Sequence, residues 1–123
     1  MKALKIWKNT GLRLSTSLFT TLMLTATLGK IQFQGHYETW YNLPMNNIVE
    51  TAQRNGVSGN ELGDNDYWER KDGCKMYGKY IICASAPERY GEVVETSRGL
   101  GIILDTGDFV KDEPDTIDMA VTW

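Results

Sequence analysis

Residues 99–120 read GLGIILDTGDFVKDEPDTIDMA, and this stretch predicts two strands joined by an acidic loop. The apolar run 101–104 is typical of a short buried strand, which ends at Asp105 before a Thr-Gly turn. After the loop, residues 117–123 predict a closing strand that contains Asp118. Because side chains alternate along a strand, Asp118 faces away from its two apolar neighbours. A carboxylate in an apolar strand is costly unless it is paired or functional, so Asp105 and Asp118 are the first candidate site residues.

Upstream of this stretch, two cysteines flank the segment KMYGKYII. If Gly78-Lys79 forms a two-residue hairpin turn, Cys74 and Cys83 lie directly opposite each other on the two strands. The pair is then either a cross-strand disulfide or two buried free thiols, and the sequence leaves both alternatives open. Two cysteines are too few for a disulfide framework.

Farther upstream, the chain predicts one strand and one helix. Residues 33–41 are rich in aromatic and β-forming side chains and are typical of a strand. Asn42 and the proline two residues later predict the start of a helix over residues 43–55, and Gly56 predicts its end. The remaining segments resemble short strands separated by turns. This density of strands favours a mainly β fold, with residues 31–123 forming a closed barrel of six or seven strands.

The first thirty residues differ from the rest of the chain in charge. Residues 1–30 carry five basic side chains and no acid, whereas residues 31–123 carry a net charge of −8. The basic start is followed by an uncharged stretch over residues 14–28, a pattern typical of a signal or anchor segment. An amphipathic or disordered tail is the alternative. We expect a secreted or envelope-associated protein, with a cytoplasmic location as the alternative, and the acidic body argues against nucleic-acid binding.

The last nineteen residues hold six acidic side chains against one lysine. Crowding of Asp105 and Asp118 should raise the pKa of one of them through desolvation and like-charge repulsion. A protonated carboxyl group beside an ionised one is the arrangement that glycosidic-bond cleavage uses. The other acids are expected to be solvated or to cap turns: Asp108, Asp112, Glu113 and Asp115. Their spacing matches no EF-hand calcium loop, and His36 is the only histidine, so no metal or other cofactor is predicted.

Residues 99–120 resemble the end of the 3D (Asp-Asp-Asp) domain family and are similar to the catalytic barrel of the membrane-bound lytic murein transglycosylase A family. The matching residues are Asp105, Thr106 and Gly107 for the Asp-Thr-Gly element, Lys111 for the loop lysine, and Ile117 and Asp118 for the closing Ile-Asp. The resemblance covers residues 81–120 and implies a double-psi β-barrel. It also implies that Asp118 is the catalytic acid/base and that Asp105 supports it. Residues 81–87, which take the place of the family's first Asp, contain no acid.

The resemblance implies that peptidoglycan or another polysaccharide is the partner, and it leaves two functions open. One is a peptidoglycan-cleaving enzyme of the lytic transglycosylase type with an Asp acid/base. The alternative is a non-catalytic glycan- or envelope-binding accessory module, including one of phage origin. Under either function, the expected glycan contacts are Thr106, Gly107, Asp108 and Lys111, with Trp40 and Trp68 as stacking surfaces. Core packing is the alternative role for both tryptophans.

Overall fold

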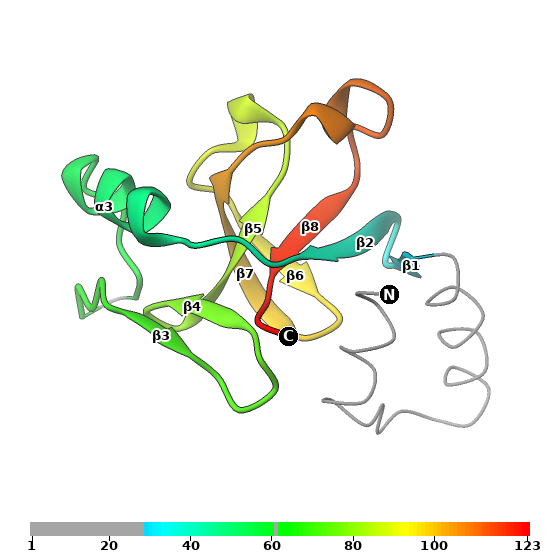
Figure 1. Ribbon diagram of the computed structural model, residues 1–123. Helices are drawn as coiled ribbons and strands as arrows, with labels where there is room; N and C mark the ends of the chain where they lie inside the picture. The colour runs from blue at the N-terminus through cyan, green and yellow to red at the C-terminus, as the bar shows by residue number, and fades with distance from the viewer. Residues whose placement is uncertain (1–28, 61) are drawn as a thin grey trace.

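The computed structural model describes residues 29–60 and 62–123 (Figure 1). This part of the chain is mainly β and contains one α-helix, α3 (Asn46–Arg54). The strands are β1 (Ile31–Phe33), β2 (His36–Tyr41), β3 (Tyr67–Glu69), β4 (Lys75–Tyr77), β5 (Tyr80–Ala84), β6 (Val93–Thr96), β7 (Gly99–Asp105) and β8 (Ile117–Ala120). Two 3-10 turns, η1 (Pro87–Arg89) and η2 (Asp108–Lys111), complete it. The predicted signal or anchor segment, residues 1–30, lies outside the described residues except for its last two.

The described strands form one mixed sheet. Its order is β1-β2-β8-β5-β4-β3, and β7 pairs with β5 and carries β6 on its other side. The pairs β2–β8 and β5–β7 run parallel, and the other pairs run antiparallel. The predicted mainly β class with one short helix is therefore confirmed. Closure of the sheet into a barrel of six or seven strands is not confirmed. The eight described strands form an open sheet that branches at β5 and has β1, β3 and β6 as its edge strands.

The hairpin predicted around Gly78-Lys79 forms with the expected register over its first two residue pairs. The pairing does not continue as far as the cysteines. Strand β5 passes from β4 to β8, so Cys83 lies opposite Met119, while Cys74 forms a bridge with Val121. The prediction that the two cysteines face each other across the hairpin is wrong, because β8 takes the position beside β5. Both thiols are buried and free, which is the alternative that the sequence left open.

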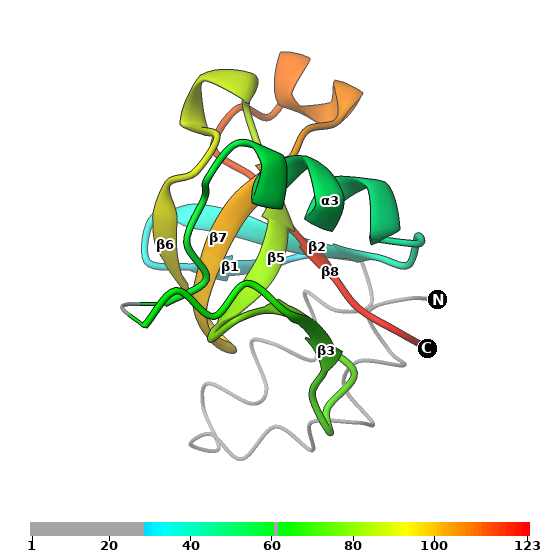
Figure 2. The same ribbon diagram turned by 90° about the vertical axis from the view of Figure 1, so that its left-hand side faces the viewer.

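The sheet is buried on both faces, and each face contributes to a separate apolar cluster. The first core comprises Ile31, Trp40, Cys74, Met76, Ile81, Cys83, Ile103, Ile117, Met119 and Val121. The second core comprises Tyr41, Met45, Val49, Ala52, Tyr77, Ile82, Ala84, Ile102, Leu104 and Ala120. Helix α3 lies over the second core (Figure 2). Burial on both faces explains why the central strands are almost continuously apolar rather than alternating.

Helix α3 is shorter than predicted at its N-terminal end. It begins after Met45, so Asn42 does not cap it and Pro44 precedes its first turn. The Asn42 side chain instead accepts a hydrogen bond from Lys75 Nζ at 2.9 Å. After the helix, Gly56 has a φ of 72°, the left-handed conformation expected of a C-terminal glycine. The predicted strand 33–41 is also divided, because a turn after β1 separates it from β2.

Candidate functional site

Asp105 and Asp118 flank one residue of the central strand β5. Ala84 pairs with Asp105 on β7 and with Asp118 on β8. On the β7 side the register shifts between Cys83 and Ala84, and this irregularity brings Asp105, rather than the residue before it, opposite Ala84. The backbones of the two aspartates are therefore about two strand spacings, or roughly 10 Å, apart. Ala84 lies between them on the intervening strand.

The Tyr41 side chain connects the two aspartates electrostatically. Its hydroxyl group donates a hydrogen bond to Asp105 Oδ2 at 2.9 Å. Burial raises the pKa of Tyr41 strongly, and the negative charges of Asp105 and, more weakly, Asp118 raise it further. The phenol therefore stays protonated at physiological pH and keeps its donor directed at Asp105. Tyr41 is not among the site residues predicted from the sequence, because its contact with Asp105 joins residues that are 64 positions apart.

Asp118 is half-buried and opens onto a hollow of about 320 Å³. Thr39, which lies opposite Asp118 on β2, donates its hydroxyl hydrogen to Asp118 Oδ1 at 2.8 Å. The hollow is also lined by Phe109 and Thr116, which belong to the loop between β7 and β8. Thr39 is a second site residue that the sequence does not predict, since only the parallel pairing of β2 with β8 places it beside Asp118.

Asp105 opens onto a separate hollow of about 270 Å³, which Leu104, Thr106 and Tyr90 help to line. The backbone N–H of Thr106 donates to Asp105 Oδ1 at 2.8 Å. Each Asp105 oxygen thus has a donor, one from this amide and one from Tyr41. These contacts fix the orientation of the Asp105 carboxylate. The structure places the two predicted aspartates on either side of Ala84, each at the edge of its own hollow.

The predicted glycan contacts differ in how near they lie to the two aspartates. Thr106 and Gly107 follow Asp105 directly, and a side chain at Gly107 would collide with the Phe109 ring, which is 2.8 Å from the position of an added Cβ. Asp108 and Lys111 form an exposed ion pair of 3.9 Å on η2, directed into solvent. Neither of these charged residues lines the Asp105 hollow or the Asp118 hollow.

The two predicted stacking tryptophans lie in different surroundings. Trp40 touches the Asp118 hollow but is only 3% exposed, so its ring offers no open face for a sugar. Trp68 is 44% exposed, but its indole N–H donates to the Gly78 carbonyl at 2.6 Å. That contact lies beside the β4–β5 turn, at the opposite end of β5 from Ala84. Trp40 is part of the first core, and Trp68 lies away from the aspartates.

Within the described residues, no group of three or more His, Cys, Asp or Glu side chains is arranged to hold a metal ion. None of the helices in that part of the chain has the length and apolar character needed to cross a membrane. Comparison of the chain with protein-family models, with curated proteins and with solved structures finds no match. The fold and the site thus define a mainly β protein with two aspartates beside a buried tyrosine.

Proposed function

We propose that this chain is a cell-wall glycan-active protein in which Asp118 is the acid/base and Asp105 supports it. The observation that carries the proposal is the placement of both carboxylates beside Ala84, with the Tyr41 hydroxyl bonded to Asp105. The parallel pairs β2–β8 and β5–β7 support assignment of the sheet to the double-psi barrel type. The basic, acid-free start of the sequence supports a place in the cell envelope.

In the proposed reaction, protonated Asp118 gives its proton to the glycosidic oxygen as the bond to the anomeric carbon breaks. The 6-hydroxyl group of the same sugar attacks that carbon, and Asp118 then accepts the hydroxyl proton. One residue serves as acid and then as base, so no second nucleophilic carboxylate is required. The Asp105 side chain supports this step by stabilising positive charge that develops at the sugar. Thr39 holds the Asp118 carboxyl group in a fixed orientation during both steps.

A non-catalytic glycan-binding module is the second candidate, and Ala84 is the observation that favours it. Ala84 lies in the segment where the resemblance to the 3D family would place the first acid, and it occupies the centre of the site. A methyl group there can neither share a proton with the flanking aspartates nor tune their charge. A binding module would retain the two hollows without needing that chemistry.

Incubation of the purified chain with peptidoglycan, followed by mass analysis of the released fragments, tests the proposal. Asp118→Asn should lower the rate of cleavage by about 10²–10⁴-fold, because the amide cannot transfer a proton. Asp105→Asn and Tyr41→Phe should lower the rate of cleavage less, since Asp105 and Tyr41 support Asp118 and do not transfer the proton themselves. Asp112→Asn, an exposed loop acid, is the matched control and should leave the rate unchanged.

Two results distinguish the candidates. Equal cleavage by the wild type and Asp118→Asn would reject the acid/base role. If the wild type releases no fragments but sediments with the peptidoglycan, the binding module is the correct function. Circular dichroism of each variant confirms that the substitutions act on the site and not on the fold.

A further inference from the structure

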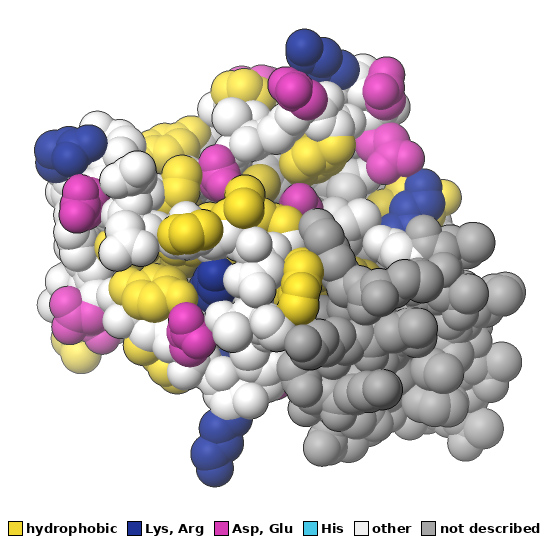
Figure 3. All heavy atoms as spheres, viewed as in Figure 1, with side chains coloured by type: hydrophobic (Ala, Val, Ile, Leu, Met, Phe, Trp, Pro, Cys, Tyr) yellow, Lys and Arg dark blue, Asp and Glu magenta, His cyan; other side chains and the backbone are white. Residues whose placement is uncertain are grey.

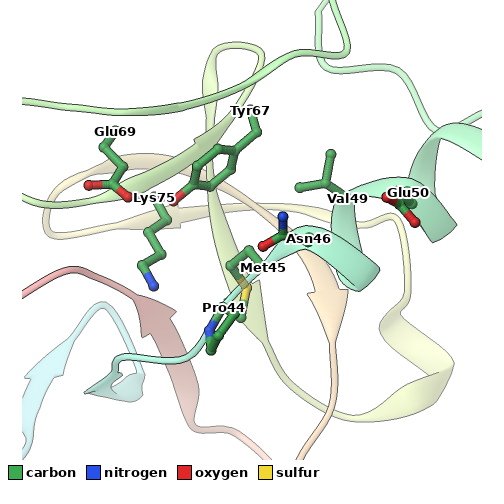
Figure 4. A pocket seen from close by; sticks show the side chains of 8 residues that line it. All are labelled: Pro44, Met45, Asn46, Val49, Glu50, Tyr67, Glu69 and Lys75. Atoms are coloured by element: carbon green, nitrogen blue, oxygen red, sulfur yellow. Dashed lines mark hydrogen bonds between the residues drawn. The ribbon is translucent and has the colours of Figure 1, made fainter.

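A third hollow, of about 330 Å³, lies between the start of helix α3 and the strands β3 and β4 (Figure 4). Met45 and Val49 from the helix side form its apolar wall, and both are buried. Lys75 comes from β4, and Tyr67 and Glu69 come from β3. Figure 3 shows hydrophobic side chains gathered on the side of the molecule that carries α3 and β3, with acidic side chains around them.

Lys75 is a buried cation whose hydrogen-bond partners are both neutral. The residue is only 5% exposed. Its ammonium group donates to Asn42 Oδ1 at 2.9 Å and to the Leu43 carbonyl at 2.6 Å. These two bonds use two of its three N–H donors, and no ion pair with Lys75 forms among the described residues. Burial accordingly lowers the pKa of Lys75, and the charge of Glu69 opposes this effect. A buried charge without a counterion favours an anionic ligand.

The start of helix α3 adds positive potential to the same hollow. No side chain caps the helix at Met45, and its first turn contains no acidic residue. Unpaired N–H groups at a helix start attract negative charge. Together with the Lys75 ammonium group, the helix start gives the hollow two sources of positive potential.

The rim of the hollow has the opposite charge. Glu69 is exposed and accepts a hydrogen bond from the Tyr67 hydroxyl at 2.8 Å, and Glu50 on the helix is also exposed. These carboxylates would repel a simple anion at the entrance, but they would attract a ligand that also carries a positive group. A buried cation, two exposed carboxylates and an apolar wall therefore match a zwitterion.

We propose that this hollow binds a short zwitterionic peptide, with its free carboxylate on Lys75 and its free amine at Glu69, the cross-strand partner of Lys75. The small side chains of such a peptide would lie against Met45 and Val49. The volume of about 330 Å³ accommodates a dipeptide of small residues. This inference does not depend on the proposed glycan function, because Asp105 and Asp118 take no part in it.

Titration of the full chain with the dipeptide alanyl-alanine, followed by two-dimensional NMR, tests the site. We expect saturable binding with a Kd of about 1 mM, as suits a ligand of this size. The dipeptide amide, which lacks the carboxylate, and the N-acetylated dipeptide, which lacks the amine, should each bind about tenfold more weakly. Lys75→Met should weaken the binding of alanyl-alanine by about the same factor or more. Lys71→Met, which removes an exposed lysine from the nearby turn, is the matched control and should bind normally.

A second variant keeps the test decisive if Lys75→Met does not fold. The double variant Glu50→Gln with Glu69→Gln changes only exposed side chains. It should weaken binding of the dipeptide and strengthen binding of acetate, a simple anion. Absence of saturable binding up to tens of millimolar would overturn the proposal. Equal affinity for the dipeptide and its amide would do the same, as would a double glutamine variant that binds every probe like the wild type.

Discussion

Asp72 lies in the turn between β3 and β4, where its carboxylate contacts the Arg70 guanidinium group. Arg70 donates to the two carboxylate oxygens at 3.0 Å and 2.8 Å, and the Cys74 amide donates at 3.2 Å. Burial opposes ionisation of Asp72, but the Arg70 and Cys74 contacts outweigh it and lower the pKa of Asp72 to about 2. Arg70 also donates to the Arg98 carbonyl at 2.9 Å. This charged turn therefore links the β3–β4 connection to the β6–β7 connection.

We predict that Asp72→Asn destabilises the protein at neutral pH but much less at pH 2. The folded-state pKa is below the unfolded value of about 3.9. Ionised Asp72 therefore stabilises the fold above that value, and the contribution is lost as the pH falls toward about 2. After allowance for solvent screening, the loss in free energy of unfolding at pH 7 should be about 1 kcal/mol. Urea titrations at both pH values measure it, and Asp112→Asn serves as the exposed control. An equal deficit at both pH values would contradict the role of the charge.

At this scale, the sequence predicted the acids of the candidate site but not the groups that orient them. Asp105 and Asp118 were identified because each stands at or inside an apolar strand. Tyr41 and Thr39 were not, since their hydrogen bonds to the aspartates join residues 64 and 79 positions apart. Trp40 was assigned a glycan contact from its aromatic character, although the same character suits the core that it occupies. Side-chain chemistry alone does not decide between a glycan contact and a place in the core.

The β4–β5 turn is the element that positions the long loop after helix α3. The backbone N–H of Gly78 donates to the Asp66 carbonyl at 2.9 Å, and that of Lys79 donates to the Gly59 carbonyl at 3.0 Å. Gly78 has a φ of 60°, and an added Cβ would lie 2.4 Å from the Gly59 oxygen and 2.6 Å from the Asp64 oxygen. The turn needs glycine for its left-handed backbone and for this close approach.

We predict that Gly78→Ala lowers the free energy of unfolding by about 3 kcal/mol, which combines backbone strain with a collision against the loop. Gly56→Ala is the matched control. Gly56 has a similarly positive φ of 72°, but nothing lies within 4 Å of an added Cβ. Gly56→Ala should lower the free energy of unfolding by about 1 kcal/mol, from backbone strain alone. Urea denaturation of both variants gives the comparison, and equal costs would show that the loop yields to the added methyl group.

Elements defined by local sequence were predicted well, and those defined by distant partners were not. The hairpin at Gly78-Lys79 and the helix before Gly56 follow from turn residues and apolar spacing within a few positions. The pairing of β8 with β5 and with β2 has no such local cause. It also redirects β5 away from β4, which is why the predicted Cys74–Cys83 juxtaposition failed. The fold class could be derived from strand density, whereas the closed barrel required the pairing order.

On the scale of the whole molecule, one sheet separates two apolar cores. Ile102 belongs to the second core and Ile103 to the first, although they are neighbours on β7. The strands β4, β5, β7 and β8 likewise contribute to both cores. Neither core can therefore be lost without disordering strands that also line the other. The two clusters should unfold together even though they share no side chain.

We predict that Ile102→Val and Ile103→Val each lower the stability of the same single unfolding transition. Each substitution removes one buried methylene group and should cost about 1 kcal/mol, on opposite faces of one strand. For a domain of this size, that corresponds to a fall in Tm of roughly 4–8 °C for each variant. The double variant should lose about the sum, because the two side chains belong to different cores. Tryptophan fluorescence and far-ultraviolet circular dichroism, recorded during the same urea titration, should give coincident midpoints in all three variants. Trp40 reports on the first core, so a fluorescence midpoint that shifts in Ile103→Val while the circular dichroism midpoint stays in place would show that the two cores unfold separately.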